Sequence, residues 1–540
     1  MKRLLIILFC LVHCNVFGAV ILSDDFNDGN ATGWTTVSNS SYGTPSWQVI
    51  GGVYKQVNDI KGFDRSYHLG AYSYYTAGLS LTDYSVNVTI IPGLATVRDT
   101  VGVMFRYQDN NNYYRLSMSR FQGFYRLEKK VGGTFSPLAV TGRGPVEGVV
   151  QNVSIDIIGS KIFCSINGSV IFSIEDSSIA AGSVALYCMG QAQFDDVVIV
   201  DDAVTAPRVA ITAPLAYSVM NSGVVDVAAI AVNIPQNGSV QFWLDDTFSS
   251  GLLQTPPFTA QFPGVSAGNH TLSAIVYDDL SNQVAIDATK TNVGVDGTII
   301  VAIGDSITNG TQDNLAADDS ATNGRNIGRG FTPILAGALE TGLQYPVMVY
   351  NEGLGGLKSS DGAANVASTI DRYPDADYWL ILYGTNDATP TLFTPSGESC
   401  TEVDLAAGLS ECDGTYKQYL RTMILTLKGS GRIPLLAKVP YIGDATTTED
   451  TRIQSYNIVI DQLIVEHSLQ TPAPDLYSFF ANNPAQLADF THPTGQGYAS
   501  LAGLWYDELT DPSTGVFTLA ITDPPPPTGG NGSVFSASFY

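Results

Sequence analysis

The sequence predicts a multidomain protein in which two β-rich domains precede a C-terminal α/β domain. At 540 residues the chain is too long for one hydrophobic core, so several domains are expected. Short runs that alternate apolar and polar residues dominate the N-terminal half, whereas continuous apolar runs separated by helical patterns follow Asp296. The first pattern is typical of β-sandwiches, and the second is typical of a parallel sheet covered by helices.

Residues 1–18 have the composition of a signal peptide. Lys2 and Arg3 precede an apolar run at 4–11, and the small residue Gly18 follows it. The run is too short to span a bilayer, and no later stretch is long and apolar enough to do so. We therefore expect a secreted protein, extracellular or periplasmic, without a membrane span.

The chain is strongly acidic. It carries 51 acidic and 26 basic side chains, a formal net charge of −25. Such a charge disfavours binding to nucleic acid or to anionic lipid. The acidic residues are scattered rather than gathered in a tail, which indicates a solubilising surface, and we expect a monomer.

Two of the six cysteines lie in the predicted signal peptide. The other four form two local pairs, Cys164 with Cys188 and Cys400 with Cys412. In an oxidising compartment each pair can close within its own domain, so the sequence predicts two disulfides. The alternative for either pair is two buried free thiols.

Residues 19–202 show the alternating pattern of an all-β sandwich, with Gly, Asn and Asp turns between the runs. The segment opens with an acidic stretch at 24–29 and closes with Phe-Asp-Asp-Val at 194–197. In these features it resembles the concanavalin A-like (laminin G-like) jelly rolls that are attached to many secreted carbohydrate-active proteins. The resemblance implies a jelly roll that can bind carbohydrate.

The two acidic ends of this segment are expected to meet on neighbouring strands. Clustered carboxylates suit a hard cation, so Asp25 and Asp195 are candidate ligands of a structural calcium ion. A pair of solvated strand ends is the alternative. Aromatic side chains in the segment either fill the core or stack on sugars. They include Trp34, Trp47, Tyr67, Tyr72, Tyr74 and Tyr75.

Residues 207–295 follow a short linker and predict a second, smaller set of strands. The stretch at 268–278 is similar to the late strands of bacterial immunoglobulin-like modules. That resemblance implies an immunoglobulin-like sandwich that serves as a spacer between the flanking domains.

Residues 297–512 predict the α/β domain. A β-branched apolar run at 298–303 indicates a strand buried on both faces, and further short apolar runs follow at 347–350, 379–383 and 433–439, with helical patterns between them. Beyond this domain, residues 523–540 form a Pro/Gly-rich linker and tail, in which serial prolines cannot join a packed core.

Three polar motifs follow the predicted strands of this domain. The first, Gly-Asp-Ser-Ile-Thr at 304–308, places Ser306 at the carboxyl end of a strand, where open α/β sheets bind their ligands. The second, Asn-Glu-Gly-Leu-Gly-Gly at 351–356, can present a bare backbone amide. The third, Gly-Thr-Asn-Asp at 384–387, offers the side-chain amide of Asn386 as a hydrogen-bond donor.

A fourth motif, Asp-Phe-Thr-His at 489–492, lies near the end of the domain. A carboxylate three residues before a histidine can hold the ring in one tautomer, which leaves the other ring nitrogen free to take a serine proton. Taken singly, Ser306 is equally a turn serine and Asp489 a helix cap. Four such motifs in this order on the right strand ends favour a catalytic function.

In these four motifs, residues 297 to 510 resemble the SGNH (GDSL-like) serine hydrolases. The resemblance implies a flavodoxin-like fold in which Ser306 is the nucleophile, His492 the general base and acid, and Asp489 the group that orients it. Gly356 and Asn386, together with the amide of Ser306, would form the oxyanion hole.

Gly355 is the alternative to Gly356, which stands five residues after Asn351 as the family pattern requires. One departure from the pattern is a long insertion at 387–416 with Cys400 and Cys412, which is expected to shape the rim of the site. His467 is expected at the surface.

The resemblance implies a secreted serine esterase that works through an acyl-enzyme without a metal or other cofactor in the chemistry. The similarity of the domain set to that of secreted carbohydrate esterases favours acetylated polysaccharide as substrate. A lipid or aryl esterase is the alternative within the same class. A carbohydrate-binding adhesin with an inactive hydrolase domain is the alternative of a different class.

Overall fold

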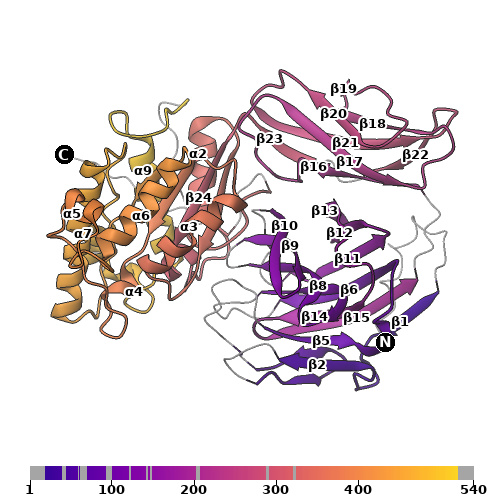
Figure 1. Ribbon diagram of the computed structural model, residues 1–540, viewed down its shortest axis with the longest axis horizontal. Coiled ribbons are helices and arrows are strands. Elements are labelled where there is room, and N and C mark those ends of the chain that lie inside the picture. Colours follow the sequence, from indigo (N-terminus) through magenta and orange to yellow (C-terminus); the bar gives the residue numbers. More distant parts are fainter. Residues whose placement is uncertain are drawn as a thin grey trace, which may run out of the picture.

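The computed structural model contains three domains that follow one another along the chain (Figure 1). The predicted signal peptide at 1–18 and the predicted tail at 523–540 lie outside the described residues, as does most of the linker before residue 207. The structure describes residues 19–38, 44–58, 60, 70–92, 100–120, 123–141, 144–145, 149–201, 207–287, 291–319 and 324–520.

The N-terminal domain is a sandwich of two antiparallel sheets. In β11, every second side chain is fully buried, which is the alternation that the sequence predicted. The first sheet has the order β13 (Ser169–Glu175), β12 (Lys161–Ile166), β11 (Gln151–Ile158), β6 (Tyr84–Pro92), β15 (Ala192–Asp201), β4 (Tyr54–Gln56) and β3 (Trp47–Val49), with β1 (Val20–Asp24) paired to β15. The second has the order β10 (Thr134–Thr141), β9 (Phe124–Val131), β8 (Asn112–Ser119), β7 (Val101–Asp109), β14 (Ser183–Cys188), β5 (Ala71–Tyr75) and β2 (Trp34–Ser38).

The predicted disulfide between Cys164 and Cys188 is wrong. Both residues are buried free thiols in the core of the sandwich. Cys164 lies on β12 in the first sheet and Cys188 ends β14 in the second. Facing sheets stand about 10 Å apart, whereas a disulfide needs Cα atoms within about 7 Å of each other, so the spacing of the two cysteines along the chain was no guide.

The middle domain is a second, smaller antiparallel sandwich with its own apolar core. One sheet has the order β16 (Arg208–Ala213), β17 (Val225–Val232) and β20 (Phe258–Phe262). The other has the order β19 (Phe248–Ser249), β18 (Ser239–Leu244), β21 (Gly268–Tyr277) and β22 (Gln283–Ile286), with β23 (Thr291–Val295) paired to β21.

The C-terminal domain is an α/β fold around a parallel four-stranded sheet. The sheet has the order β25 (Val347–Gly353), β24 (Thr298–Gly304), β26 (Tyr378–Leu382) and β27 (Ile433–Leu436). Its helices are α1 (Ser306–Asn309), α2 (Phe331–Leu343), α3 (Ser359–Arg372), α4 (Thr385–Ala388), α5 (Glu402–Ala407), α6 (Tyr416–Gly429), α7 (Thr447–Glu466), α8 (Leu476–Asn482) and α9 (Gly495–Thr510). The multidomain fold class, two β-sandwiches followed by an α/β domain, is therefore confirmed.

Helices cover both faces of this sheet, and β24 is buried along its whole length. Ile300 and Ala302 pack into the core that contains α2 and α9, whereas Val301 and Ile303 pack into the core that contains α3 and α6. Burial on both faces explains why the sequence of this strand shows no polar alternation. No helix within the described residues is long and apolar enough to cross a membrane.

The N-terminal sandwich packs directly on the α/β domain (Figure 1). Arg126 on β9 lies 3.5 Å from the carboxylate of Glu352 on β25. The backbone N–H of Gly144 donates to the carbonyl of Ile327 at 3.1 Å. The middle domain therefore does not hold its neighbours apart as the predicted spacer would.

Candidate active site

The carboxyl ends of three neighbouring strands bring three of the four sequence motifs together. Ser306 begins α1 immediately after β24, the Gly355–Gly356 loop follows β25, and Asn386 lies in α4 after β26. In a parallel sheet these strand ends share one edge, which is where open α/β folds place their ligand sites. Ser306, Gly356, Asn386 and His492 all line one cavity at this edge.

Local sequence fixes the position of Ser306. The buried carboxylate of Asp305 caps α1 by accepting from the N–H of Ile307 at 2.9 Å. A Cβ on Gly304 would lie 2.1 Å from the hydroxyl oxygen of Thr308 and 2.5 Å from the carbonyl of Leu382, so only glycine lets β24 run this close to α1. The tight turn leaves Ser306 at the first helical position, where the N–H has no partner within the helix.

His492 bridges Ser306 and Asp489. Its Nε2 lies 2.8 Å from Ser306 Oγ, and its Nδ1 lies 2.8 Å from Asp489 Oδ2. The first of these contacts joins residues 186 positions apart in the chain. The fourth motif thus reaches the edge of the sheet where the other three meet, and its spacing provides the hydrogen bond between carboxylate and ring that the sequence predicted.

The charge on Asp489 determines the tautomer of His492. Burial alone would raise the pKa of Asp489, but the backbone N–H and the ring of His492 outweigh it and hold that pKa below its ordinary value. The ionised carboxylate can only accept, so Nδ1 of His492 carries the proton and Nε2 accepts from the hydroxyl of Ser306. This is the arrangement in which a histidine can remove the serine proton.

The two residues expected to donate to a developing oxyanion line the same cavity as Ser306. Gly356 has φ of +82°, a conformation that favours glycine, and its loop lines the cavity beside Ser306. The Nδ2 group of Asn386 donates one hydrogen to the carbonyl of Leu357 at 2.9 Å, which orients the amide and leaves its second hydrogen for another acceptor.

Asp387 joins the two segments that carry Gly356 and Asn386, a contact that sequence analysis missed. Its carboxylate accepts from the backbone N–H of Ser359 at 2.9 Å and from the Ser359 hydroxyl at 2.7 Å. These bonds tie the start of α3, just beyond the Gly355–Gly356 loop, to the motif that carries Asn386. Its position directly after Asn386 in the third motif was the available signal.

The cavity has a volume of about 560 Å³, and most of its walls are small or polar. Sequence analysis missed the contribution of the loop after β27. This loop lines the side of the cavity facing Asn386, at the end of the fourth strand of the same sheet. The lining residues besides the predicted ones are Thr311, Gly355, Thr385, Thr389, Ile442, Asp444, Ala445, Glu449 and Thr491.

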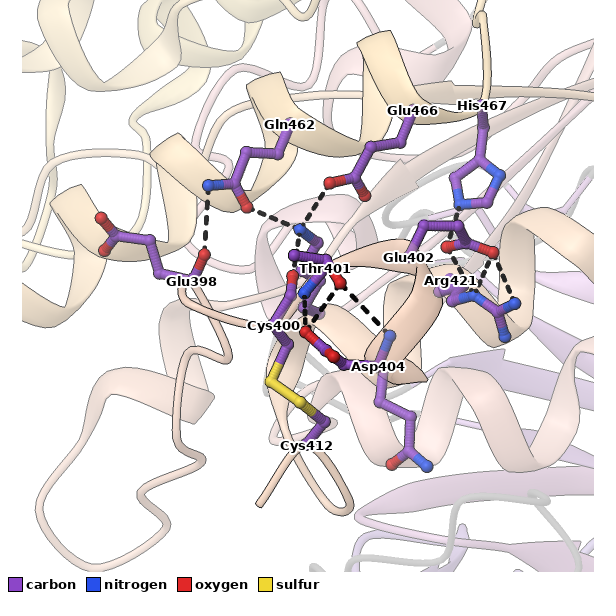
Figure 2. A network of polar contacts seen from close by, with 12 residues as sticks. Glu398, Cys400, Thr401, Glu402, Asp404, Cys412, Arg421, Gln462, Glu466 and His467 are labelled. Carbon is purple, nitrogen blue, oxygen red and sulfur yellow. Dashed lines mark hydrogen bonds and ion pairs between the residues drawn. A yellow bond between two sulfur atoms is a disulfide. The ribbon is translucent and has the colours of Figure 1, made fainter. Parts of the chain in front are cut away.

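The insertion at 387–416 contributes Thr389 to the cavity, and its remaining part is anchored elsewhere. The Cys400–Cys412 disulfide is present, as predicted. Figure 2 shows the segment around it joined to α6 and α7 by polar contacts, including Arg421 with Glu402 at 2.5 Å. His467 belongs to this network and is buried, so its predicted surface position is wrong; Glu402 lies 3.5 Å from its Nε2.

The two candidate calcium ligands of the N-terminal sandwich lie near each other, far from the cavity in the fold. Strands β1 and β15 pair with Asp24 opposite Val197, as expected for neighbouring acidic ends. Burial raises the pKa of Asp195, and the nearby carboxylates of Asp196 and Asp25 add to the rise. Among the described residues, neither Asp25 nor Asp195 belongs to a group of three side chains able to share an ion.

Comparison with known proteins agrees with this geometry. Residues 302–500 match the model of the GDSL-like Lipase/Acylhydrolase family, which confirms the resemblance expected for the α/β domain. No curated protein matches the chain.

Solved structures resemble single domains of this chain. An acetylxylan esterase from Geobacillus stearothermophilus is 22% identical and covers 39% of this chain and 93% of its own, with a TM-score of 0.30. An alpha/beta hydrolase from the metagenome of Lake Arreo is 21% identical, and the matched region covers 38% of this chain and 93% of the hydrolase, with a TM-score of 0.28. A carbohydrate-binding module from Bacillus subtilis is 19% identical, and the matched region covers 32% of this chain and 97% of the module, with a TM-score of 0.27. At these identities the likeness concerns the fold alone.

Proposed function

Residues 302–500 form a GDSL-like lipase/acylhydrolase domain, an ester hydrolase domain, and on this premise we propose that the protein is a secreted serine esterase that removes acetyl groups from polysaccharide. The observation that supports the serine mechanism best is the chain of two hydrogen bonds from Ser306 through His492 to Asp489, each 2.8 Å long. Such a chain is what activates a serine hydroxyl for acyl transfer.

In the proposed acylation step, Ser306 Oγ attacks the ester carbonyl carbon and passes its proton to Nε2 of His492. The carbonyl oxygen becomes an oxyanion that accepts hydrogen bonds from the amides of Ser306, Gly356 and Asn386. The ester C–O bond then breaks, the leaving alcohol takes the proton from His492, and an acyl group remains on Ser306. Asp489 holds the imidazolium in place throughout.

Deacylation repeats these steps with water. His492 removes a proton from water, the hydroxide attacks the acyl carbon, and the bond to Ser306 Oγ breaks as the serine regains its proton. Side chains and backbone amides supply every group that these steps need. We therefore propose that the chemistry needs no metal or other cofactor.

The walls of the cavity favour a small acyl group on a polar alcohol. Ile442 is the largest apolar side chain among the described lining residues, and none of them is Phe, Tyr or Trp. Asp444 and Glu449 make one side acidic, which suits neutral hydroxyl-rich substrates and disfavours anionic ones. A lipid esterase would need a long apolar groove to bury its acyl chain.

Secretion and glycan binding complete the proposal. The Cys400–Cys412 disulfide is typical of proteins in an oxidising compartment, and residues 1–18 have the composition of an export signal. We propose that the N-terminal sandwich binds the polysaccharide and so raises the local concentration of ester groups at the cavity.

A substrate series tests the proposed specificity. The purified protein should hydrolyse 4-nitrophenyl acetate and acetylated xylan, with kcat/KM falling steeply from acetyl to octanoyl esters because the cavity has no apolar groove for the longer chain. The measurement is kcat/KM across acetyl, butyryl and octanoyl esters, with acetate release from the polymer quantified in parallel. A higher kcat/KM for octanoyl than for acetyl esters, without acetate release from any polysaccharide, would establish the lipid esterase instead.

Retention on polysaccharide tests the sandwich. The protein with Ser306→Ala, which cannot consume its target, should be depleted from solution by insoluble xylan and released by soluble xylan. Bovine serum albumin, also acidic, is the control for retention by charge. Equal recovery of the two proteins in the supernatant, tested with xylan, cellulose and levan, would contradict glycan binding.

A further inference from the structure

Three buried carboxylates lie together behind the active-site loop that follows α1. Asp313, Asp318 and Asp319 are each more than nine-tenths buried. One oxygen from each lies within 4.8 Å of those from the other two. Three like charges this close and this poorly solvated repel one another, so either protons or a bound cation must neutralise them.

Two of these carboxylates have no hydrogen-bond partner among the residues that the structure describes. Both oxygens of Asp313 accept backbone N–H groups, from Leu315 at 3.1 Å and from Gly330 at 2.8 Å. Both oxygens of Asp318 and both of Asp319 are inaccessible, and neither carboxylate accepts a hydrogen bond from another residue in the described part of the chain. Buried carboxylates normally accept several, so four unused oxygens at one point indicate a ligand that binds oxygen.

Neighbouring arginines do not supply this compensation in full. Arg329 Nε lies 3.8 Å from Asp319 Oδ2, beyond hydrogen-bond distance, and Arg120 of the sandwich acts on Asp319 through its charge. Burial, together with the charge of Asp313, raises the pKa of Asp318 to about 7. Burial and the same neighbour raise the pKa of Asp319 to about 8. Within the described residues, Asp318 therefore faces the charge of Asp313 and forms no ion pair with a basic side chain.

The other group of three candidate ligands in the described chain differs in this respect. Glu402, Glu466 and His467 also lie within 4.8 Å of one another. Arg421 binds the Glu402 carboxylate at 2.5 Å, and Lys417 binds that of Glu466 at 2.7 Å (Figure 2). Basic side chains already neutralise that group, so it carries no comparable requirement for a cation.

We propose that Asp313, Asp318 and Asp319 bind a divalent cation, and that the cation is calcium. Carboxylate oxygens are hard ligands, and the group contains no histidine or cysteine that would favour zinc. Oxygens that share a calcium ion at about 2.4 Å lie at most about 5 Å apart, which matches the observed separation. An irregular loop suits calcium better than magnesium, which demands octahedral geometry and sheds water reluctantly.

The ion would hold a loop that supports the active site. Within the same loop, Gln312 Nε2 donates to Asp489 Oδ2 at 3.3 Å, and Asn314 Oδ1 accepts from the N–H of Gly495 at 2.9 Å. The three carboxylates themselves do not line the cavity. Calcium here is therefore a positioning and stabilising ion, and only its effect on turnover depends on the proposed esterase function.

Calcium binding to the full-length protein tests the site. Protein stripped with EDTA and freed of chelator should bind calcium in isothermal titration calorimetry. At a calcium concentration about 100-fold above the dissociation constant, its unfolding midpoint should rise by roughly 5–10 °C. Asp318→Asn should bind one equivalent less than wild type. Equal stoichiometry in the two proteins, or no binding of calcium by either, would overturn the proposal.

Two matched variants test where the calcium ion that is lost in Asp318→Asn binds. Asp195→Asn alters the acidic ends of the sandwich and Glu402→Gln alters the neutralised group, and both should retain the equivalent that Asp318→Asn loses. Loss of that equivalent in either variant would place the ion elsewhere and contradict the assignment.

The metal-free proteins provide a second readout. Without calcium, Asp318→Asn should unfold at or above the midpoint of wild type, because it removes one of three repelling charges and breaks no hydrogen bond. A lower midpoint would show that Asp318 has a structural partner and would contradict the inferred cation. Chelated wild type, assayed below its midpoint, should still hydrolyse 4-nitrophenyl acetate. A calcium-stripped protein that is folded and binds one calcium ion on re-addition, yet shows no turnover while calcium is absent, is the contrary case. That result would contradict the metal-free mechanism and leave the proposed calcium site intact.

Discussion

Replacing Ser306 by alanine is expected to lower kcat for 4-nitrophenyl acetate by roughly 10⁴–10⁶-fold, the loss typical of removing the nucleophile from a serine hydrolase. The hydroxyl forms the bond to the acyl group, and no other hydroxyl lies within hydrogen-bond distance of His492 Nε2 among the described residues. Steady-state kinetics with the spontaneous rate subtracted measure the loss.

The fold should survive this substitution. Ser306 is buried, but its side chain makes one hydrogen bond, to His492, and the removal of one such bond costs about 1 kcal/mol. Circular dichroism and the unfolding midpoint should therefore remain close to those of wild type. Ser500→Ala is the matched control, because Ser500 is a buried serine of the same domain whose hydroxyl has no hydrogen-bond partner among the described residues. Near wild-type turnover in folded Ser306→Ala protein would remove Ser306 from the mechanism.

Much of this site could be predicted because its residues follow strands. A buried apolar run ends where the chain leaves the sheet, and parallel strands leave at one edge, so Ser306 and Asn386 were expected to meet before any coordinates were known. The Asp489–His492 spacing carried its own local geometry. These predictions needed only the order of short motifs along the chain.

Features that depend on long-range packing could not be predicted in this way. The apolar run at 433–439 predicted a strand to Val439, yet β27 ends at Leu436. The side chain of Asn457 on α7 binds the backbone N–H of Val439 at 2.7 Å and its carbonyl at 3.1 Å, which replaces the hydrogen bonds of the sheet. The loop thus released supplies Ile442 and Asp444 to the cavity.

The same limit applies to residues that belong to two domains at once. Glu352 stands inside the second motif and would pass for a site residue, but its carboxylate is held by Arg372 at 2.7 Å and by Arg126 of the sandwich at 3.5 Å. Burial would raise the pKa of Glu352, but the charges of Arg372 and Arg126 outweigh burial and hold that pKa below its ordinary value. Nothing in the local sequence indicates that Arg126, 226 positions earlier in a β-sandwich, supplies the partner.

The contribution of Asn386 should appear in kcat. Asn386→Ala is expected to lower kcat for 4-nitrophenyl acetate by roughly 10²–10³-fold, the usual loss when one oxyanion donor is removed. One amide hydrogen of Asn386 is occupied by the carbonyl of Leu357, and the residue lines the cavity that contains Ser306. A bond made only in the transition state lowers kcat and kcat/KM equally, so KM should change little.

A control separates this donor role from a general disturbance of the cavity. Thr491 lines the same cavity but has no side-chain amide that could donate to an oxyanion, so Thr491→Ala should leave kcat close to wild type. Loss of the Leu357 contact could also loosen the loop that carries Gly356, which would lower the unfolding midpoint of Asn386→Ala and weaken substrate binding. A rise in KM with unchanged kcat would therefore assign Asn386 to holding that loop or the substrate, and the oxyanion would then depend on the amides of Ser306 and Gly356 alone.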